Sequence, residues 1–540
     1  MTDSPLPTNL LTWLLALVPI VLLVVLLAVL RWQAPQAGPV GMFAAAALAL
    51  TVFRAPWETV AAASGRGVWD AVFILLVVWP ALLLYRVGLA AGAFDALRRG
   101  LSRFSRNHVF LVLGFGWVFA SFMQGIAGFG APIAIVAPLL VAVGVRPVYA
   151  VVIALIGHAW ANMFGTLAVG WIATLQVVEL EHELRTAVQT ALLLWPPNLL
   201  AGVAIAWLAG RWAGLRLAWP MVLIVSLLHG GVQLAVMFWE PLLSTFLASA
   251  VALLALYPLS RWSRYAEPAA AITRRPAMRE DASDAPDEQA PEPTMGLAMA
   301  SLPYAVLTVV AVLTLAIAPV ERVLGSLEFG VPFPEVTTGY GVTTQGEAAY
   351  SPIAPLTHPG TPLLIAVLLT WLVYRQRGYF AAKRRRAGRQ PVWSGLADNA
   401  APASVAIVSF LVLAAVMEHS GQTEVLAAGV GDVSPPMVYA FAATFIGLLG
   451  AFMTSSNTAS NVLFSQLQQQ VAGGAGLADS GVIAAQSTGG AIGNAIAPAN
   501  IVLGTGTVGA VGQEGQVLRR TLPWTLAVAV LVGLLTLLFV

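Results

Sequence analysis

The sequence predicts an all-α integral membrane protein with about twelve transmembrane helices and two re-entrant hairpins in two inverted repeats. Two compositional observations indicate the class: 59% of the 540 residues are hydrophobic and 10% are charged. Soluble domains carry roughly 25% charged residues, so this chain belongs in a lipid bilayer. The third observation is that two long apolar stretches are interrupted near their centres by small and polar residues.

The predicted spans are apolar runs of about the length that crosses a bilayer, which is roughly 20 residues. They are 10–30, 38–53, 68–88, 147–173, 188–210, 217–238, 240–259, 299–321, 361–374, 399–418, 479–506 and 521–540. The start, "MTDSPLPTN", has no basic residue before its apolar run. We therefore expect the first span to be retained rather than removed as a signal peptide.

Two further stretches, 108–145 and 436–472, are too long for one crossing. The first contains "SFMQGIAGFGAP" (121–132), whose glycines allow a tight turn and whose proline suits the first turn of a returning helix. The second has hydroxyls and amides at the corresponding place, 454–461. Backbone that leaves a helix inside lipid survives only where protein buries it or where it lines an aqueous cavity. The pattern predicts two re-entrant hairpins that meet at a polar site.

The hairpins belong to a repeat offset by about 330 residues, and each is followed by a second interrupted helix. The loop before the first hairpin is strongly basic and its counterpart, 419–435, has no basic residue, so the copies are inverted. Inverted repeats with interrupted helices are typical of secondary transporters. The predicted domains are a first repeat (1–211, with hairpin 108–145 and broken helix 147–173), two connecting helices (212–259), a disordered cytoplasmic linker (260–298) and a second repeat (299–540, with hairpin 436–472 and broken helix 479–506).

Charge decides the orientation, because cytoplasmic loops carry an excess of Lys and Arg. With the N-terminus outside, all but four of the 27 Lys and Arg residues fall inside; the exceptions are Arg54, Arg66, Arg185 and Arg322. We place both termini on the periplasmic or extracellular side of a bacterial cytoplasmic (inner) membrane. The stretch 323–360 is expected to be an ordered external loop. Asp70 and Arg86 flank the third span and are interpreted as anchors at the two membrane interfaces.

The candidate site consists of small, hydroxyl and amide residues at the predicted breaks, where helix N-termini favour an anion. Its members are Gln124, Gly125, Gly128, Gly130, His158, Asn162, Ser456, Asn457, Thr458, Asn461, Thr488 and Asn494. His158 is also the candidate proton-coupling residue, because an ionisable group at mid-membrane is a functional candidate by default. Each signal has a structural alternative. Glycines pack membrane helices, Ser and Thr bond back to their own backbone, and a neutral histidine can bond a nearby carbonyl.

The chain resembles the bacterial lactate permease family at "GIAGFGAPIAI", "SSNTASNVLF" and "STGGAIGNAIAPANI", and more weakly the wider ion-transporter superfamily. The resemblance implies carriage of lactate and glycolate and an elevator-type movement of two transport halves. Three positions depart from the usual family pattern: Gln124 replaces Glu, Asn457 replaces Asp and Asn494 replaces Lys. An acidic proton carrier and a cationic carboxylate partner are thus replaced by amides.

The leading hypothesis is a secondary active transporter for a small organic monocarboxylate, driven by proton symport. The first alternative is a sodium-coupled or exchange transporter for another organic anion, such as a sulfonate or a dicarboxylate. A membrane-embedded enzyme is a remote alternative, because it would need clustered acids or a nucleophile with a base at depth. No metal or cofactor is expected. The absence of cysteine excludes disulfides, and no basic patch indicates nucleic acid. The partners are the anion, a proton or sodium, and the bilayer, with a homodimer left open.

Overall fold

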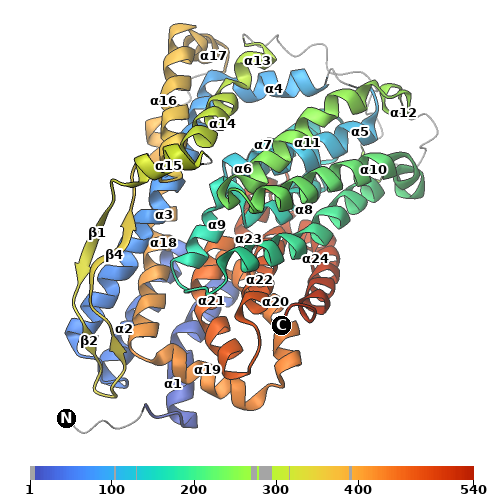
Figure 1. Ribbon diagram of the computed structural model, residues 1–540. Helices are drawn as coiled ribbons and strands as arrows, with labels where there is room; N and C mark the ends of the chain where they lie inside the picture. The colour runs from blue at the N-terminus through green and yellow to red at the C-terminus, as the bar shows by residue number, and fades with distance from the viewer. Residues whose placement is uncertain are drawn as a thin grey trace.

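Helices form most of the molecule, as the sequence predicts (Figure 1). The computed structural model describes residues 6–102, 105–128, 130–268, 276–278, 295–315, 317–387 and 392–540. Each of the twelve predicted spans overlaps a helix, while most of the predicted linker, 260–298, lies outside the described residues. Within the described part of the chain, eight helices are long and apolar enough to cross a membrane, or up to ten if each of two bent pairs is one span.

The first group of helices is built around α3 (Trp57–Ala91), which α18 (Trp393–His419) follows along its length. α18 also packs on α2 (Ala34–Thr51), and α16 (Gly360–Gln376) packs on α3. Figure 1 shows α3 and α18 side by side although they are far apart in the sequence. The other helices of this group are α1 (Leu10–Val24, continued by a π-helical turn Val25–Val29), α4 (Ala93–Ser102), α13 (Leu297–Ala300), α14 (Leu302–Leu315), α15 (Ala318–Gly325), α17 (Tyr379–Ala387) and α19 (Gln422–Val433).

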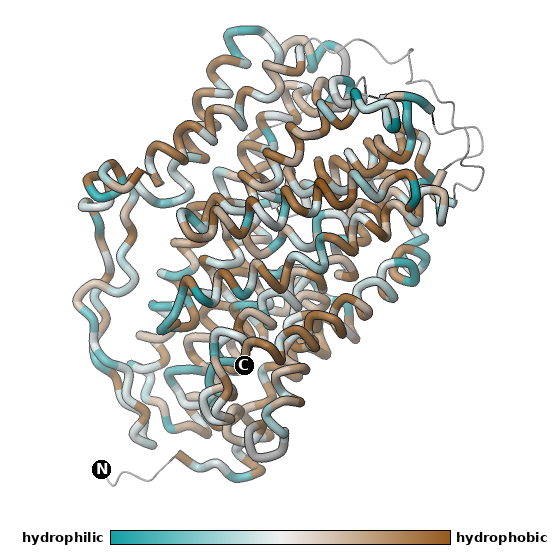
Figure 2. Tube along the Cα trace, turned by 45° about the vertical axis from the view of Figure 1, so that its right-hand side comes forward, coloured by the Kyte–Doolittle hydropathy of each residue, from teal (hydrophilic) through white to brown (hydrophobic). Residues whose placement is uncertain are grey.

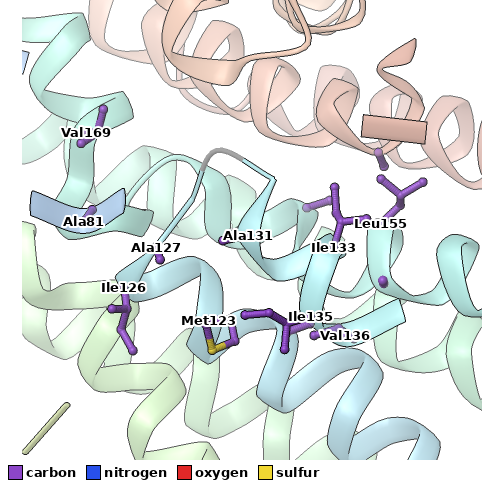
Figure 3. Packing of buried hydrophobic residues seen from close by; sticks show 14 of the residues in the cluster. Ala81, Met123, Ile126, Ala127, Ala131, Ile133, Ile135, Val136, Leu155 and Val169 are labelled. Carbon is purple, nitrogen blue, oxygen red and sulfur yellow. The ribbon is translucent and has the colours of Figure 1, made fainter. Parts of the chain in front are cut away.

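The first predicted hairpin is a helix–turn–helix unit followed by a broken helix. Its elements are α5 (His108–Leu113), a π-helical segment (Gly114–Phe119), α6 (Ala120–Ile126), α7 (Ala131–Ala142), α8 (Pro147–Ala159), a 3₁₀ turn (Trp160–Asn162) and α9 (Gly165–Leu175). The two parts of the broken helix are bent by 52°. Figure 3 shows Met123 and Ile126 on α6, and Ile133 of α7 close to Leu155 of α8. Apolar packing therefore holds the hairpin against the first part of the broken helix.

One close contact explains how tightly these elements pack. A Cβ atom on Gly157 of α8 would overlap the carbonyl oxygen of Gly116 in the π-helical segment. Only glycine lets the two backbones approach so closely. The connecting helices then run across this unit: α10 (Glu183–Met237, interrupted at Gly210 and Arg211), α11 (Ser244–Arg261, preceded by a 3₁₀ turn Pro241–Leu243) and α12 (Ser263–Ala266).

The second predicted hairpin has the same order of elements. They are α20 (Pro436–Thr454), α21 (Asn457–Gly474), α22 (Asp479–Gly493), a 3₁₀ turn (Asn494–Ile496), α23 (Pro498–Thr507) and the last helix, α24 (Glu514–Thr536). Buried amides join this hairpin to its broken helix. Tyr439 donates to Gln468 at 2.7 Å, Gln468 donates to Gln486 at 3.0 Å, and Gln486 donates to the Ser460 carbonyl at 3.2 Å. These four buried residues therefore find their hydrogen-bond partners inside the bundle, where water does not supply them.

The predicted external loop contains two small antiparallel sheets. β1 (Phe329–Phe333) pairs with β4 (Glu347–Ile353), and β2 (Val336–Thr337) pairs with β3 (Thr343–Thr344). We call the segment 329–353 the strap, because its strands lie along α3 in Figure 1.

Polar contacts fix the strap to α3. Arg66 forms a 3.0 Å ion pair with Glu347, and the Trp69 indole donates to the Ser351 carbonyl at 2.9 Å. The interpretation of Asp70 as an interfacial anchor is wrong. The residue is 3% exposed, and its carboxylate accepts a hydrogen bond from Tyr350 of the strap.

The surface has the character expected of a protein in lipid. Large apolar side chains are exposed along the outer helices, including Leu254 of α11, Leu368 of α16 and Leu534 of α24. Figure 2 shows hydrophobic segments running along the long helices and hydrophilic ones mainly near their ends. Polar residues such as Gln486 and Asn461 are instead fully buried. This distribution suits a bilayer, where the bundle interior must satisfy the polar groups.

Candidate functional site

A cavity of about 290 Å³ lies where the two hairpins and the two broken helices meet. Its wall also includes parts of α3 and α18. The lining residues are Leu82, Gln124, Gly128, Gly130, Ile133, His158, Asn162, Gly165, Thr166, Val169, Gly170, Asn399, Ala403, Ser455, Ser456, Asn457, Thr458, Asn494, Ala499, Asn500 and Leu503. Among these described lining residues, His158 is the one ionisable side chain, and amides and hydroxyls supply most of the remaining polar groups.

The tip of the first hairpin is held by a threonine of the broken helix that follows it. The Gly128 amide donates to Thr166 Oγ1 at 2.7 Å, and that hydroxyl lies 3.5 Å from the Gln124 carbonyl. Gly130 has φ 84°, a left-handed conformation that glycine adopts without strain. Ala131 donates its amide to the Gly128 carbonyl at 3.1 Å. With Pro132 next in the chain, this tip offers fewer free N–H groups than its glycines alone would indicate.

The start of α9 is a left-handed turn beside the cavity. Thr166, Leu167 and Ala168 have φ values of 53°, 50° and 60°. Left-handed backbone costs about 1–2 kcal/mol for each non-glycine residue. The Trp171 amide closes the turn by donating to the Met163 carbonyl at 3.2 Å. Such backbone strain persists only where the surrounding packing and hydrogen bonds hold the conformation in place, and strained residues cluster at functional sites.

The tip of the second hairpin contributes a helix N-terminus. Ser455 is left-handed, with φ 58°, and Ser456 caps α21 by accepting a 3.2 Å hydrogen bond from the Ala459 amide. Asn457 and Thr458 follow at the first helical positions and line the cavity. Since the positive end of a helix dipole lies at its N-terminus, α21 directs a partial positive charge at the cavity.

Side chains of the second hairpin also contact the first broken helix directly. Asn457 and Asn461 donate to Met163 Sδ at 3.5 and 3.2 Å, and Asn461 lies 3.4 Å from the Gly170 carbonyl. In return, Asn162 lies 3.4 Å from the Ala491 carbonyl of α22. Residues 291 to 329 positions apart in the sequence therefore meet at the cavity.

His158 has one ring nitrogen bonded within its own helix. Nδ1 lies 2.6 Å from the Ala154 carbonyl, so it donates to that oxygen, while the residue as a whole lines the cavity. The bond fixes the ring orientation, and Nε2 is the nitrogen left to exchange a proton. The alternative interpretation of His158, a neutral histidine that only bonds a nearby carbonyl, therefore accounts for Nδ1 but not for Nε2.

Nine of the twelve sequence-predicted site residues line the cavity. Three do not: Gly125, Asn461 and Thr488. Gly125 packs against the backbone of Phe246 on α11, Asn461 lies behind Gly170, and Thr488 is fully buried in α22. All twelve residues thus lie in one region of the molecule. Gly125, Asn461 and Thr488 pack behind the residues that line the cavity and do not line it themselves.

Several residues that line the cavity are not among the twelve predicted site residues. Thr166 follows Gly165 inside the predicted broken helix 147–173, so its position was the available signal. Ser455 belongs to the predicted polar tip 454–461, although it was not among the twelve site residues. Asn399 and Leu82 come from helices without an interruption, and no local pattern indicates that α3 and α18 reach the cavity.

The fold and the cavity define the class: a multi-pass membrane protein with a polar site enclosed by interrupted helices, as in membrane transporters. The sequence profile of the L-lactate permease family matches residues 12–540. The chain belongs to the L-lactate permease family.

Individual relatives agree with this assignment. The chain is 27% identical over 558 residues to glycolate permease GlcA of Escherichia coli (strain K12), covering 97% of this chain and 95% of that protein. It is 28% identical over 492 residues to the L-lactate permease of Salmonella typhi, covering 87% and 84%. The crystal structure of the Alcanivorax borkumensis YdaH transporter matches with a TM-score of 0.42 and 14% identity over 88% of this chain and 86% of its own.

Proposed function

We propose that the protein is a secondary transporter that moves a small organic monocarboxylate, of the lactate or glycolate type, together with protons. The observation that carries the proposal is the cavity between the two hairpins, whose volume of about 290 Å³ suits a small solute. The names of the relatives, glycolate permease and L-lactate permease, support this substrate class.

The lining residues would recognise a carboxylate and a hydroxyl by hydrogen bonding. The amides of Gln124, Asn457 and Asn494 supply donors, and the N-terminus of α21 supplies a partial positive charge. Ser456 and Thr458 offer hydroxyls that donate or accept. The three amides that replace the usual charged residues of the family would therefore act as neutral hydrogen-bonding groups.

His158 would carry the coupled proton. It is the ionisable side chain that the described lining residues provide, and its Nε2 is the nitrogen without a bond inside its own helix. Protonation would add a positive charge next to a bound carboxylate, so anion and proton would favour each other's binding. This reciprocity is the thermodynamic basis of symport.

We also propose that the hairpins are re-entrant and that they move with their broken helices against α3 and α18, in the manner of an elevator. Figure 1 places α4 and α17, which carry basic residues, at the end of the molecule opposite the N-terminus. By the positive-inside rule that end would face the cytoplasm of a bacterial inner membrane, with the N-terminus outside.

Uptake of labelled lactate and glycolate into proteoliposomes tests the proposal. Accumulation should follow an imposed inward proton gradient and collapse when a protonophore is added. His158→Gln should abolish the response to the gradient, while His182→Gln, at an exposed position before α10, serves as the matched control. Accumulation that ignores the proton gradient would overturn proton coupling, and absence of any uptake would remove this substrate class.

Sodium coupling is the second candidate, and one observation favours it. Asn457 Oδ1, Asn461 Oδ1 and Ser487 Oγ are buried oxygens without a hydrogen-bond partner among the described residues. Oxygen atoms of this kind are ligands for hard cations. In the same proteoliposomes, uptake that follows a sodium gradient and is lost in Asn461→Leu would select this candidate, including its version with a sulfonate or dicarboxylate substrate.

A further inference from the structure

The cavity poses an electrostatic problem, because none of its described lining residues is a lysine or an arginine. An anion inside a membrane protein is costly to bury unless a positive charge or several donors compensate it. The wall formed by α3 and α18 suggests where such a charge lies. Leu82 of α3 and Asn399 of α18 both line the cavity.

Arg86 follows Leu82 by one helical turn on α3. Positions i and i+4 of a helix lie on the same face, so Arg86 is directed to the side of α3 that borders the cavity. Its guanidinium reaches Asn399 of α18. With the amide turned so that its oxygen accepts, Arg86 Nη2 and Nε donate to Asn399 Oδ1 at 2.6 and 3.3 Å. Arg86 is half-buried rather than extended into solvent.

A second feature of α18 supports this placement. A Cβ on Gly395 would lie 2.6 Å from Arg86 Nη1, so the glycine makes room for the guanidinium one turn before Asn399. The arginine is therefore seated in a space between the two helices. The interpretation of Arg86 as an anchor at the membrane interface did not include this contact with α18.

The contact has a consequence for the cavity. Because Asn399 Oδ1 accepts from the guanidinium, Nδ2 is the donor that this lining residue would offer to a solute in the cavity. Hydrogen bonding to a cation polarises the amide and strengthens these donors. The guanidinium itself adds a positive potential at this wall of the cavity.

We infer that Arg86, acting through Asn399, provides the positive charge that selects a carboxylate over a neutral solute of the same shape. The inference rests on the proposed function and deepens it. Arg86 is a positioning residue in this scheme, and Asn399 is the group that touches the substrate. The sequence offered no such partner, because the lysine usual in the family is Asn494 here.

The test compares lactate with its neutral isostere lactamide on purified protein in proteoliposomes. Arg86→Gln should raise the half-saturation concentration for lactate uptake about tenfold, leaving the maximal rate within about twofold. Inhibition by lactamide should not weaken, so discrimination between anion and amide falls by the same factor. Arg86→Lys should be intermediate, and adding Arg86→Gln to Asn399→Ala should cause little further loss beyond that of Asn399→Ala alone.

Arg264→Gln is the matched control, since that half-buried guanidinium donates to the Leu217 carbonyl at 2.8 Å and does not line the cavity. Unchanged lactate affinity and unchanged discrimination in a folded Arg86→Gln protein would overturn the inference and leave the proposed function standing. Thermal stabilisation of the unmodified protein by a panel of organic anions distinguishes failure of this inference from failure of the proposed function. If another anion binds, the comparison is repeated with it, and if none binds, both proposals are overturned.

Discussion

Tyr350 of the strap donates a 3.0 Å hydrogen bond to Asp70 Oδ2 of α3, across 280 positions of the sequence. Asp70 Oδ1 has no partner among the described residues, and the residue is 3% exposed. The carboxyl group therefore depends on one tyrosine for its hydrogen bonding. Arg66, one turn earlier on α3, is bonded to Glu347 and to the Gln345 carbonyl instead.

Removing the tyrosine hydroxyl tests how much the strap contributes to stability. Tyr350→Phe should lower the free energy of unfolding by about 1–3 kcal/mol, because a buried acceptor loses its donor. In a double-mutant cycle, adding Asp70→Ala should produce much less than the sum of the single losses. Thermal unfolding in detergent measures both. Tyr340→Phe, in the same strap but stacked on Arg54, is the control. Equal effects of the two tyrosine substitutions would contradict the assigned role.

The meeting of the two halves can be tested by cross-linking, since the chain has no cysteine of its own. A Cβ on Gly130, at the tip of the first hairpin, would contact Leu503 of α23. Gly130→Cys with Leu503→Cys should therefore form a disulfide in membranes treated with an oxidant. Gly130→Cys with Leu10→Cys should not, because α1 packs on α2 and α19. Failure of the first pair in folded protein, or equal yields from both, would refute the proximity.

Gly157 allows the close approach of α8 to the π-helical segment. Gly157→Ala should destabilise the protein by about 3 kcal/mol, because the added methyl group would overlap the Gly116 backbone. Gly473→Ala, near the end of α21 with nothing within 4 Å, should leave stability unchanged or slightly raised. Thermal unfolding of both variants provides the comparison. A tolerated Gly157→Ala would mean that these backbones are farther apart.

Glu240, between α10 and the 3₁₀ turn Pro241–Leu243, makes stability depend on pH. Burial raises the pKa of its carboxyl from 4.5 to about 7, and Glu321 acts in the same direction, while the 3.2 Å hydrogen bond from the Leu242 amide opposes them. Between these pH values the folded state binds more protons than the unfolded state. The free energy of unfolding therefore falls as pH rises from 4.5 to 7, by up to about 3 kcal/mol.

Glu240→Gln should remove this contribution, so that its melting temperature changes less between pH 5 and pH 8 than that of the unmodified protein. Glu424→Gln, at an exposed position in the first turn of α19, should keep the original slope. Parallel pH profiles for all three proteins would show that Glu240 titrates at its ordinary value.

The site was predictable wherever a local pattern interrupts a helix. Glycine and proline at 125–132, and hydroxyls and amides at 454–461, indicate breaks because such residues weaken a helix or cap it. Nine predicted residues accordingly line one cavity. The missed residues, Asn399 and Leu82, lie on helices with ordinary local sequence, and their role comes from which neighbour each helix packs against.

By itself, the amino-acid sequence determined the membrane class, the order of hairpins and broken helices, and the polar character of the site, because hydropathy and helix-breaking residues act over a few turns. Tertiary structure alone decided that Thr166 closes the first tip, that Asp70 is buried under the strap, and that Arg86 reaches Asn399. These contacts join residues that are distant in the chain. They follow from the packing of whole helices, which no short segment of sequence encodes.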